Sequence, residues 1–214
     1  MSEIPRIKTL SETLTTDSRE GNAVVMVGSF APIHDGHFDA VHSASAALIN
    51  RGHSVESLVL APNSSEYLQN KLAEESDEWP YERRVEYILG RDPHPTIPTY
   101  VDDISARLAQ EKQINNFVSE TIQRRLGFDA LRLYLVVGSD QLLSMEAHLS
   151  EGDGKAICVL RPGSMDEVQE RLKISWISDA TASERLIITE RGNMEQDVSS
   201  TAIRRSVGRV DSVV

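Results

Sequence analysis

Two histidines, His34 and His37, stand in the segment GSFAPIHDGH, which runs from residue 28 to residue 37. An apolar run at residues 23–27 precedes the segment, and apolar residues at helical spacing follow it. A helix that begins near Gly36 would turn its free N–H groups and the positive end of its dipole toward this loop. Such a helix end binds anions, so two imidazoles beside it favour a phosphate site.

The histidines also have plainer interpretations. Either one taken alone could be a surface residue or a capped residue of the core, and the pair could bind a metal. Two histidines without an obvious third ligand make a poor zinc site, however, and Cys158 is the only cysteine. A single cysteine also excludes an intramolecular disulfide framework. We therefore expect phosphate binding at this loop and no metal ligands among the protein side chains.

A second block, SSTAIR, occupies residues 199–204. Ser199 or Ser200 is a good N-cap for a helix that starts behind it. The serines, Thr201 and Arg204 would then offer hydroxyls, free N–H groups and a charged fork to a phosphate. Taken alone, the same pattern is that of an ordinary capped helix with a solvated arginine.

An acidic residue follows another apolar run. Asp140 comes after residues 131–137 and the pair Gly138 and Ser139. At the end of a strand its carboxylate could lie near a ribose or an amine, or it could simply cap a helix. The residues alone leave both interpretations open.

These motifs need a scaffold that brings them together, and the alternation of patterns predicts one. Apolar runs typical of buried strands alternate with amphipathic helical patterns. Strand–helix–strand order requires right-handed crossovers and a parallel sheet, so the expected fold class is α/β with a doubly wound parallel sheet. Ligands bind such sheets beyond the carboxyl ends of the strands, where the motifs lie. We expect strands at residues 23–27, 55–62, 131–137, 156–160 and 186–189, and helices at residues 38–48, 81–89, 104–126, 165–172 and 200–207.

The remaining segments are polar or rich in proline. We expect residues 1–22 to be a polar N-terminal arm, frayed or in a short helix, and residues 23–214 to form a single domain. Residues 63–79 are polar and irregular, and the prolines of residues 91–98 predict a loop.

Composition narrows the classes of function. The sequence has 22 lysines and arginines against 33 aspartates and glutamates, and the net charge of −11 argues against a basic surface for nucleic acid. No apolar stretch approaches the roughly 18 residues that span a bilayer. The first 21 residues lack the apolar region of a secretory signal. We therefore expect a cytoplasmic protein without nucleic-acid or membrane partners, in which a local basic pocket can still bind phosphates.

The three motifs together resemble a known family. The segments at residues 28–37, 138–142 and 199–204, in this order, are similar to those of the nucleotidyltransferases with the HxGH signature. The form of the last block makes the sequence most similar to nicotinamide or nicotinate mononucleotide adenylyltransferases. The resemblance covers residues 24–207 and implies a Rossmann-like nucleotidyltransferase fold. It implies transfer of AMP from ATP, carried with Mg²⁺, to a mononucleotide, with release of pyrophosphate.

The resemblance also implies residue roles. His34, His37 and Arg204 would be the catalytic residues, with His37 stabilising charge on the α-phosphate under attack. The first three residues of the loop would offer backbone groups to the acceptor phosphate and nucleoside, and the turn at residues 161–163 would close near the nucleotide base. The whole phosphate- and nucleotide-binding set would be Gly28, Ser29, Phe30, Gly36, Asp140, Ser199, Ser200 and Thr201.

The acceptor is less well specified. Trp79 is the candidate for stacking on a pyridine ring, and its alternative is to pack against the following helix. The sequence departs from the family at Ala31, where asparagine or aspartate is usual, and no tryptophan follows closely after Asp140. Most charges in this region fit a solvated face. Weaker candidates for the acceptor pocket are Tyr67, Lys71, Arg83 and Arg84.

Two alternatives to this function stay open. The acceptor could be another phosphorylated compound, such as phosphopantetheine, or the nucleotide could be CTP. The chain could also be a nucleotide-binding sensor without turnover, although a sensor has no need of both histidines and Arg204. The sequence distinguishes neither the amide from the acid form of the mononucleotide nor a monomer from a homo-oligomer.

Overall fold

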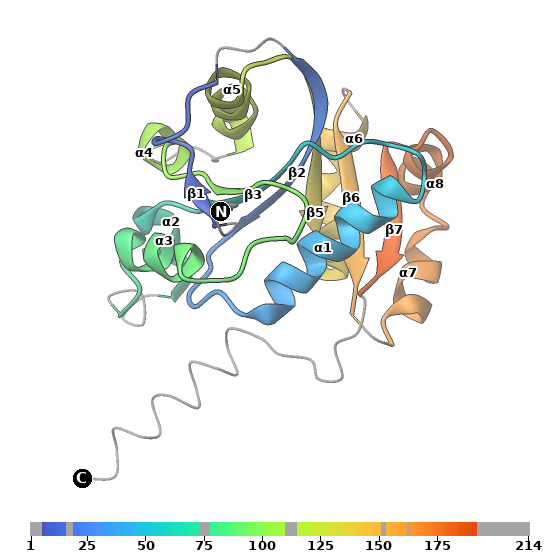
Figure 1. The fold of residues 1–214 in the computed structure, drawn as a ribbon. Coiled ribbons are helices and arrows are strands. Elements are labelled where there is room, and N and C mark those ends of the chain that lie inside the picture. The colour runs from blue at the N-terminus through green and yellow to red at the C-terminus, as the bar shows by residue number, and fades with distance from the viewer. Residues whose placement is uncertain are drawn as a thin grey trace, which may run out of the picture.

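The computed structural model describes residues 6–15, 19–72, 78–109, 115–150, 153–161 and 163–191. In this part of the chain, seven strands form one sheet in the order β1-β4-β3-β2-β5-β6-β7, and every neighbouring pair is parallel (Figure 1). Helices cover both faces of the sheet, which confirms the predicted doubly wound α/β architecture. The strands are β1 (Lys8–Thr9), β2 (Arg19–Gly28), β3 (Ser57–Pro62), β4 (Thr99–Val101), β5 (Phe128–Val137), β6 (Lys155–Leu160) and β7 (Leu186–Glu190).

The two faces of the sheet bury separate cores. Val24 and Val25 are adjacent in β2 but belong to opposite cores, because successive side chains of a strand point to opposite faces. The first core lies under α1, which crosses the sheet in front of β5, β6 and β7 in Figure 1, and the second lies under α5, α7 and α8. The helices are α1 (Asp35–Ile49), α2 (Ser65–Leu72), α3 (Tyr81–Leu89), α4 (Ser105–Ala109), α5 (Asn115–Leu126), the 3₁₀-helix η2 (Ser139–Met145), α6 (Glu146–Ser150), α7 (Met165–Arg171) and α8 (Ser175–Ala182).

The strand order reverses between β2 and β5. From β2 the chain proceeds outward through β3 to β4, and it then returns to the other side of β2 as β5 and proceeds to β6 and β7. The connections that leave the carboxyl ends of β2 and β5 therefore diverge to opposite faces. Such a switch point opens a crevice at those strand ends, and it is the usual ligand site of an open α/β sheet.

The expected polar arm at residues 1–22 is wrong in its described part. Residues 8–9 form the edge strand β1, which pairs with β4, and Ile7 and Leu10 on either side of it are buried. The central strand β2 begins at Arg19, well before the apolar run, because its first residues pair with β5. Polar residues therefore form strand here through pairing with their neighbours rather than through an apolar pattern of their own.

The single long helix expected at residues 104–126 is also wrong. The described residues form two helices, α4 and α5, with residues 110–114 outside the described part. Ser105 Oγ lies 2.9 Å from Thr121 Oγ1, 16 residues later. In one straight helix these residues would stand about 24 Å apart, so α5 must fold back against α4.

Five further elements were not expected. Part of the segment predicted to be irregular forms α2, the short β4 lies inside the sheet, η2 and α6 follow β5, and α8 precedes β7. The helix predicted at residues 200–207 lies outside the described residues. None of the helices in the described ranges is both long and apolar enough to cross a membrane.

Candidate active site

A pocket of about 330 Å³ opens at the switch point, where the carboxyl ends of the strands meet. It receives residues from the loops after β2, β5, β6 and β7 and from the end of α2. The structure thereby brings together five chain segments that are separated in sequence. The predicted site residues among its lining are Gly28, Ser29, Phe30, His34, His37 and Asp140.

The loop after β2 is folded around the ring of Phe30. This residue is 1% exposed and has a φ of +47°, a left-handed conformation that is uncommon for a residue with a side chain. A Cβ added at Gly28 would lie 2.8 Å from Phe30 Cε1, so only glycine fits at the end of the strand. The ring of His37 meets the Phe30 ring edge-on, with the centroids 5.2 Å apart. Phe30 thus packs the loop against the start of α1 rather than presenting its ring to a ligand.

The two histidines lie against each other at the beginning of α1. His34 occupies the N-cap position, and the centroids of the two rings are 3.9 Å apart. The backbone N–H of His34 donates a hydrogen bond to Nδ1 of His37 over 3.2 Å. An Nδ1 that accepts a hydrogen bond carries no proton, so the proton of neutral His37 is on Nε2. The helix start itself therefore selects the tautomer of His37 that can donate to a ligand.

Both imidazoles are held neutral. Burial, followed by the neighbouring His34 and Arg191, lowers the pKa of His37 to about 3. Burial and then Arg191 lower the pKa of His34 to about 4. At neutral pH these side chains offer N–H donors without positive charge.

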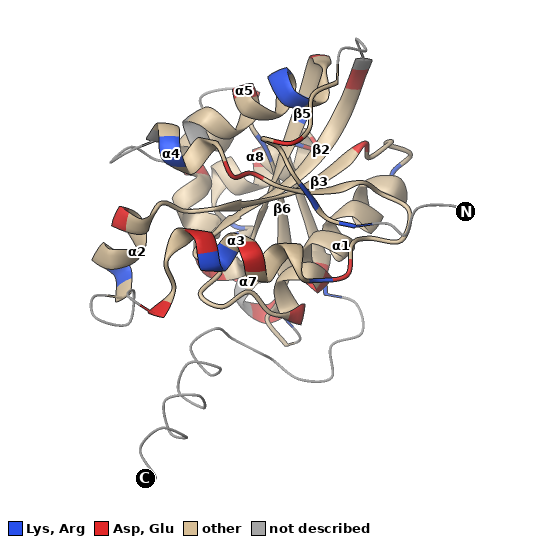
Figure 2. Ribbon diagram, turned by 60° about the vertical axis from the view of Figure 1, so that its left-hand side comes forward, with Lys and Arg blue, Asp and Glu red and all other residues tan. Residues whose placement is uncertain are grey.

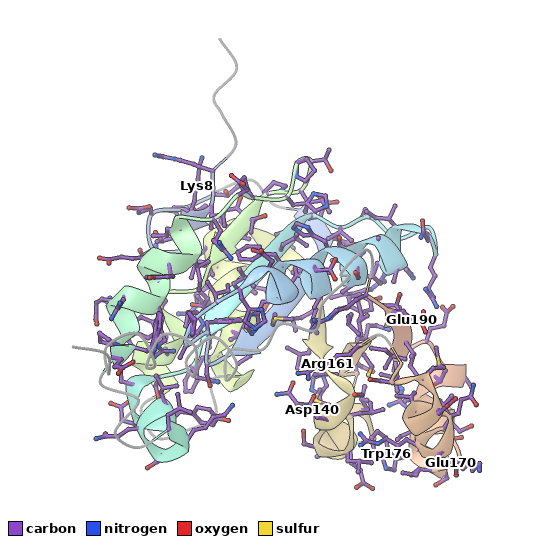
Figure 3. All side chains as sticks on the ribbon, turned by 90° about the horizontal axis from the view of Figure 1, so that it is seen from below. Lys8, Asp140, Arg161, Glu170, Trp176 and Glu190 are labelled. Carbon is purple, nitrogen blue, oxygen red and sulfur yellow. The ribbon has the colours of Figure 1, made fainter. Side chains whose placement is uncertain are left out.

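Positive charge in the pocket comes instead from Arg161, Arg191 and Lys71. Arg161 directly follows β6 and Arg191 directly follows β7. Figure 3 shows Arg161 near Asp140, at the strand ends beside α1. The sequence had indicated the turn at Arg161 and had ranked Lys71 as a weak candidate, whereas Arg191 was missed. Its only sequence signal is its place directly after a strand.

The predicted Gly36 and Asp140, together with Gly138 before Asp140, fit around these groups. A Cβ at Gly36 would lie 3.0 Å from Nη1 of Arg191, so the glycine lets the guanidinium approach the first turn of α1. A Cβ at Gly138 would lie 2.5 Å from Oδ1 of Asp140. Gly138 therefore leaves room for the carboxylate, which is on an exposed residue at the start of η2. Asp140 is positioned to accept hydrogen bonds from a ligand in the pocket.

Trp79 is not in the pocket. Its side chain is 8% exposed and packs in a small cluster with Ala31 and Leu68, and its ring also meets Tyr87 edge-on at 5.3 Å. The packing alternative is thus the one that the structure shows, and Trp79 is not placed to stack on an acceptor in the pocket. The buried Ala31 replaces the polar residue usual at its position, and it contributes to this cluster.

The last sequence block cannot be compared with the pocket. Ser199, Ser200, Thr201 and Arg204 lie outside the described residues, so their part in the site stays a prediction. Within the described ranges, no three His, Cys, Asp or Glu side chains come together to hold a metal ion. The donors that do meet there are imidazoles, guanidiniums and an amine, a set suited to phosphate oxygens.

Comparison with known proteins agrees with this chemistry. A search of curated proteins finds no match to the chain. A family model described as cytidylyltransferase-like matches residues 25–206, which include the β2 loop, the pocket arginines and the block at residues 199–204. The match spans most of the sequence. The chain therefore belongs to the cytidylyltransferase-like family, within the HxGH nucleotidyltransferase superfamily.

Proposed function

We propose that this nucleotidyltransferase-like protein transfers AMP from ATP to nicotinamide or nicotinate mononucleotide and releases pyrophosphate. The observation that carries the proposal is the neutral His37 at the start of α1, whose Nδ1 is held by the backbone and whose Nε2–H is left as a donor in a pocket with two arginines. The choice of a pyridine mononucleotide rests on the sequence resemblance.

The pocket has two halves, which suits a reaction that joins two nucleotides. On one side of the switch point lie Ser29 and Phe30 after β2 and Lys71 at the end of α2. On the other side lie Asp140 and the loops after β6 and β7. We place the acceptor mononucleotide in the first half and ATP in the second. Their phosphates then meet at the start of α1, where the histidines lie.

The transfer needs alignment and charge neutralisation rather than a covalent intermediate. An oxygen of the acceptor 5′-phosphate forms a bond to the α-phosphorus of ATP. The bond from the α-phosphorus to the oxygen that bridges to the β-phosphorus breaks, and its electrons leave with pyrophosphate. His37 would donate its Nε2–H to an oxygen of the α-phosphate, while Arg161 and Arg191 would offset the charge of the leaving group.

Mg²⁺ would enter with the triphosphate, since the described pocket offers one carboxylate, Asp140, among cationic and neutral donors. Bound in this way, the metal supplies further neutralisation of the phosphate charge. Arg204 and the hydroxyls beside it would complete the pyrophosphate subsite, as the sequence resemblance implies. A protein with a net charge of −11 can thus bind ATP through local positive potential.

The test is a pyrophosphate-release assay on the full chain with Mg²⁺, in which ATP or CTP is paired with each of several acceptors. The acceptors are nicotinamide mononucleotide, nicotinate mononucleotide, 4′-phosphopantetheine and phosphocholine. We expect release with ATP and a pyridine mononucleotide, and a dinucleotide of the corresponding mass.

The other outcomes separate the alternatives. Release only with CTP, or only with one of the last two acceptors, would disprove the proposed substrates while leaving nucleotidyl transfer intact. ATP binding without release with any acceptor would indicate the sensor. The control is His53→Ala, which removes a histidine from outside the pocket lining and is expected to keep full turnover.

A further inference from the structure

Arg84 is a cation inside the protein. It lies in α3, is 0% exposed, and is the largest of the fully buried side chains. Its Nε donates to the carbonyl oxygen of Trp79 over 3.1 Å, and its Nη1 donates to the carbonyl oxygen of Ser29 over 2.8 Å. Its charged neighbour in sequence, Arg83, is exposed and rests on the Trp79 ring. Figure 2 shows acidic and basic residues side by side along α3, so a solvated place for a charge was available.

The burial of Arg84 is not explained by an ion pair. No carboxylate among the described residues forms a salt bridge with it, and its Nη2 is buried without a hydrogen-bond partner there. Loss of solvation lowers the pKa of the guanidinium, while the charges of Tyr81 and Glu82 act in the opposite direction. A buried charge that is bonded mainly to carbonyl oxygens destabilises the fold relative to an apolar side chain of the same size. Packing alone therefore does not account for an arginine at this position.

The same arrangement recurs at the other loop of the switch point. Arg171, at the end of α7, donates from Nη1 to the carbonyl oxygen of Ser139. Ser139 follows Gly138 at the end of β5, as Ser29 follows Gly28 at the end of β2. A Gly-Ser pair thus stands at the carboxyl end of both strands that border the crevice, and in both pairs the serine carbonyl accepts a hydrogen bond from an arginine of a helix farther along the chain.

A serine carbonyl held in this way fixes the direction of the next N–H. In a planar trans peptide the C=O of one residue and the N–H of the next point in opposite directions. Ser29 and Phe30 line the pocket and Arg84 does not, so the Ser29 carbonyl points away from the pocket. The carbonyl of Gly28 is also bonded outside it, to the N–H of Asn63 at 2.9 Å. No group in the described part of the chain accepts a hydrogen bond from the Phe30 N–H.

We propose that Arg84 and Arg171 are positioning residues that turn two backbone N–H groups, those of Phe30 and Asp140, toward the phosphates of the two substrates. Arg84 orients the Phe30 N–H in the acceptor half of the pocket, and Arg171 orients the Asp140 N–H in the ATP half. This inference rests on the proposed function for the identity of the substrates. No described group accepts a hydrogen bond from the N–H of Phe30, which is buried, or from that of Asp140, which is exposed. An N–H without a partner in the protein is a group that a bound phosphate oxygen would satisfy.

The test compares Arg84→Met and Arg171→Met in the pyrophosphate-release assay. A hydrogen bond to a charged group changes affinity by about tenfold or more. We expect Arg84→Met to raise KM for the mononucleotide by that factor with KM for ATP little changed, and Arg171→Met to do the reverse. Arg84→Lys, which keeps the charge but has a single nitrogen with which to reach the two carbonyl oxygens, should recover part of the loss. It also serves as the folded variant if the methionine variant does not fold.

The matched control is Arg185→Met. Arg185 likewise donates to a backbone carbonyl, that of Leu149, but does not line the pocket. This control should alter thermal stability at most. If the Arg84 and Arg171 variants shift only the melting temperature, or raise both KM values equally, the proposal is wrong.

A binding measurement keeps this test separate from the proposed function. Should the wild-type chain release no pyrophosphate with any acceptor, the proposed function fails. Calorimetric titration with ATP then tests the positioning role of Arg171 independently of turnover. A wild-type chain that binds ATP, with affinity lost in Arg171→Met and kept in Arg185→Met, supports the role of Arg171, and equal affinities overturn it.

Discussion

Replacing His37 by alanine should slow the reaction without unfolding the protein. The substitution removes a single hydrogen-bond donor. Nδ1 of His37 already accepts a hydrogen bond from the N–H of His34, which leaves Nε2–H to donate to the substrate. Removal of one donor to the charge that develops in a transition state lowers kcat by about 10² to 10³, or roughly 3 to 4 kcal/mol. We expect this loss in kcat, with a smaller effect on KM for ATP.

The pH dependence of this effect distinguishes a neutral donor from a titrating acid or base. With its pKa lowered to about 3 by burial and by the charges of its neighbours, His37 stays neutral across the working range. The ratio of wild-type to His37→Ala activity should therefore be constant between about pH 5.5 and 8.5, since ionisations of the substrates cancel in the ratio. His37→Gln, which can still present an N–H, should fall between the two.

The assay is steady-state pyrophosphate release at saturating ATP and mononucleotide, with thermal unfolding of each variant measured alongside. His53→Ala is the matched control, because this histidine lies outside the pocket lining. A His37→Ala variant within threefold of the wild type would show that the imidazole does not contact the reacting phosphate. A ratio that declines as pH falls through 6.5 would show that His37 titrates normally, and the neutral-donor mechanism would be wrong.

Three further outcomes follow from the same contacts. The pKa of His34 is about 6.5 in the unfolded chain and about 4 in the folded protein, so protonation favours the unfolded chain as pH falls below 6.5. In denaturant titrations, the free energy of unfolding of His34→Gln should therefore fall by about 2 kcal/mol less than that of the wild type between pH 7 and pH 5. Gly28→Ala forces a methyl group against the buried Phe30 ring and should lower the free energy of unfolding by about 1 to 3 kcal/mol. Gly138→Ala meets only the movable Asp140 carboxylate, so it should raise KM for ATP in the release assay while the melting temperature changes little.

The pocket was predictable to the extent that its residues follow apolar strands directly. The glycines at the ends of β2 and β5 and the histidines after β2 are placed by the rule that ligands bind at strand ends, and they do line the pocket. Arg191 obeys the same rule but follows a short strand. Its contribution depends on β7 lying beside β6, and no local pattern encodes which strands are neighbours.

The errors came from contacts between distant residues. The apolar spacing continues from α4 into α5, so periodicity indicates one helix. The reversal is visible in contacts between the two helices, such as the hydrogen bond between Ser105 and Thr121. Trp79 is likewise of a residue type that often stacks on ligand rings. Its burial with Ala31 and Leu68, which no local pattern reveals, shows that it is part of the protein interior.

Neutral imidazoles make physical sense in a pocket that must be stable before substrate arrives. Arg161 and Arg191 already face it, and two imidazolium groups with ring centroids 3.9 Å apart would add repulsion between like charges. A neutral N–H donor avoids that repulsion in the empty protein, yet it still stabilises an oxygen that gains charge during the reaction. The low histidine pKa values and the adjacent arginines therefore serve different steps. The positive charge of the arginines attracts the phosphates, and the neutral N–H donors at the start of α1 stabilise the phosphate under attack.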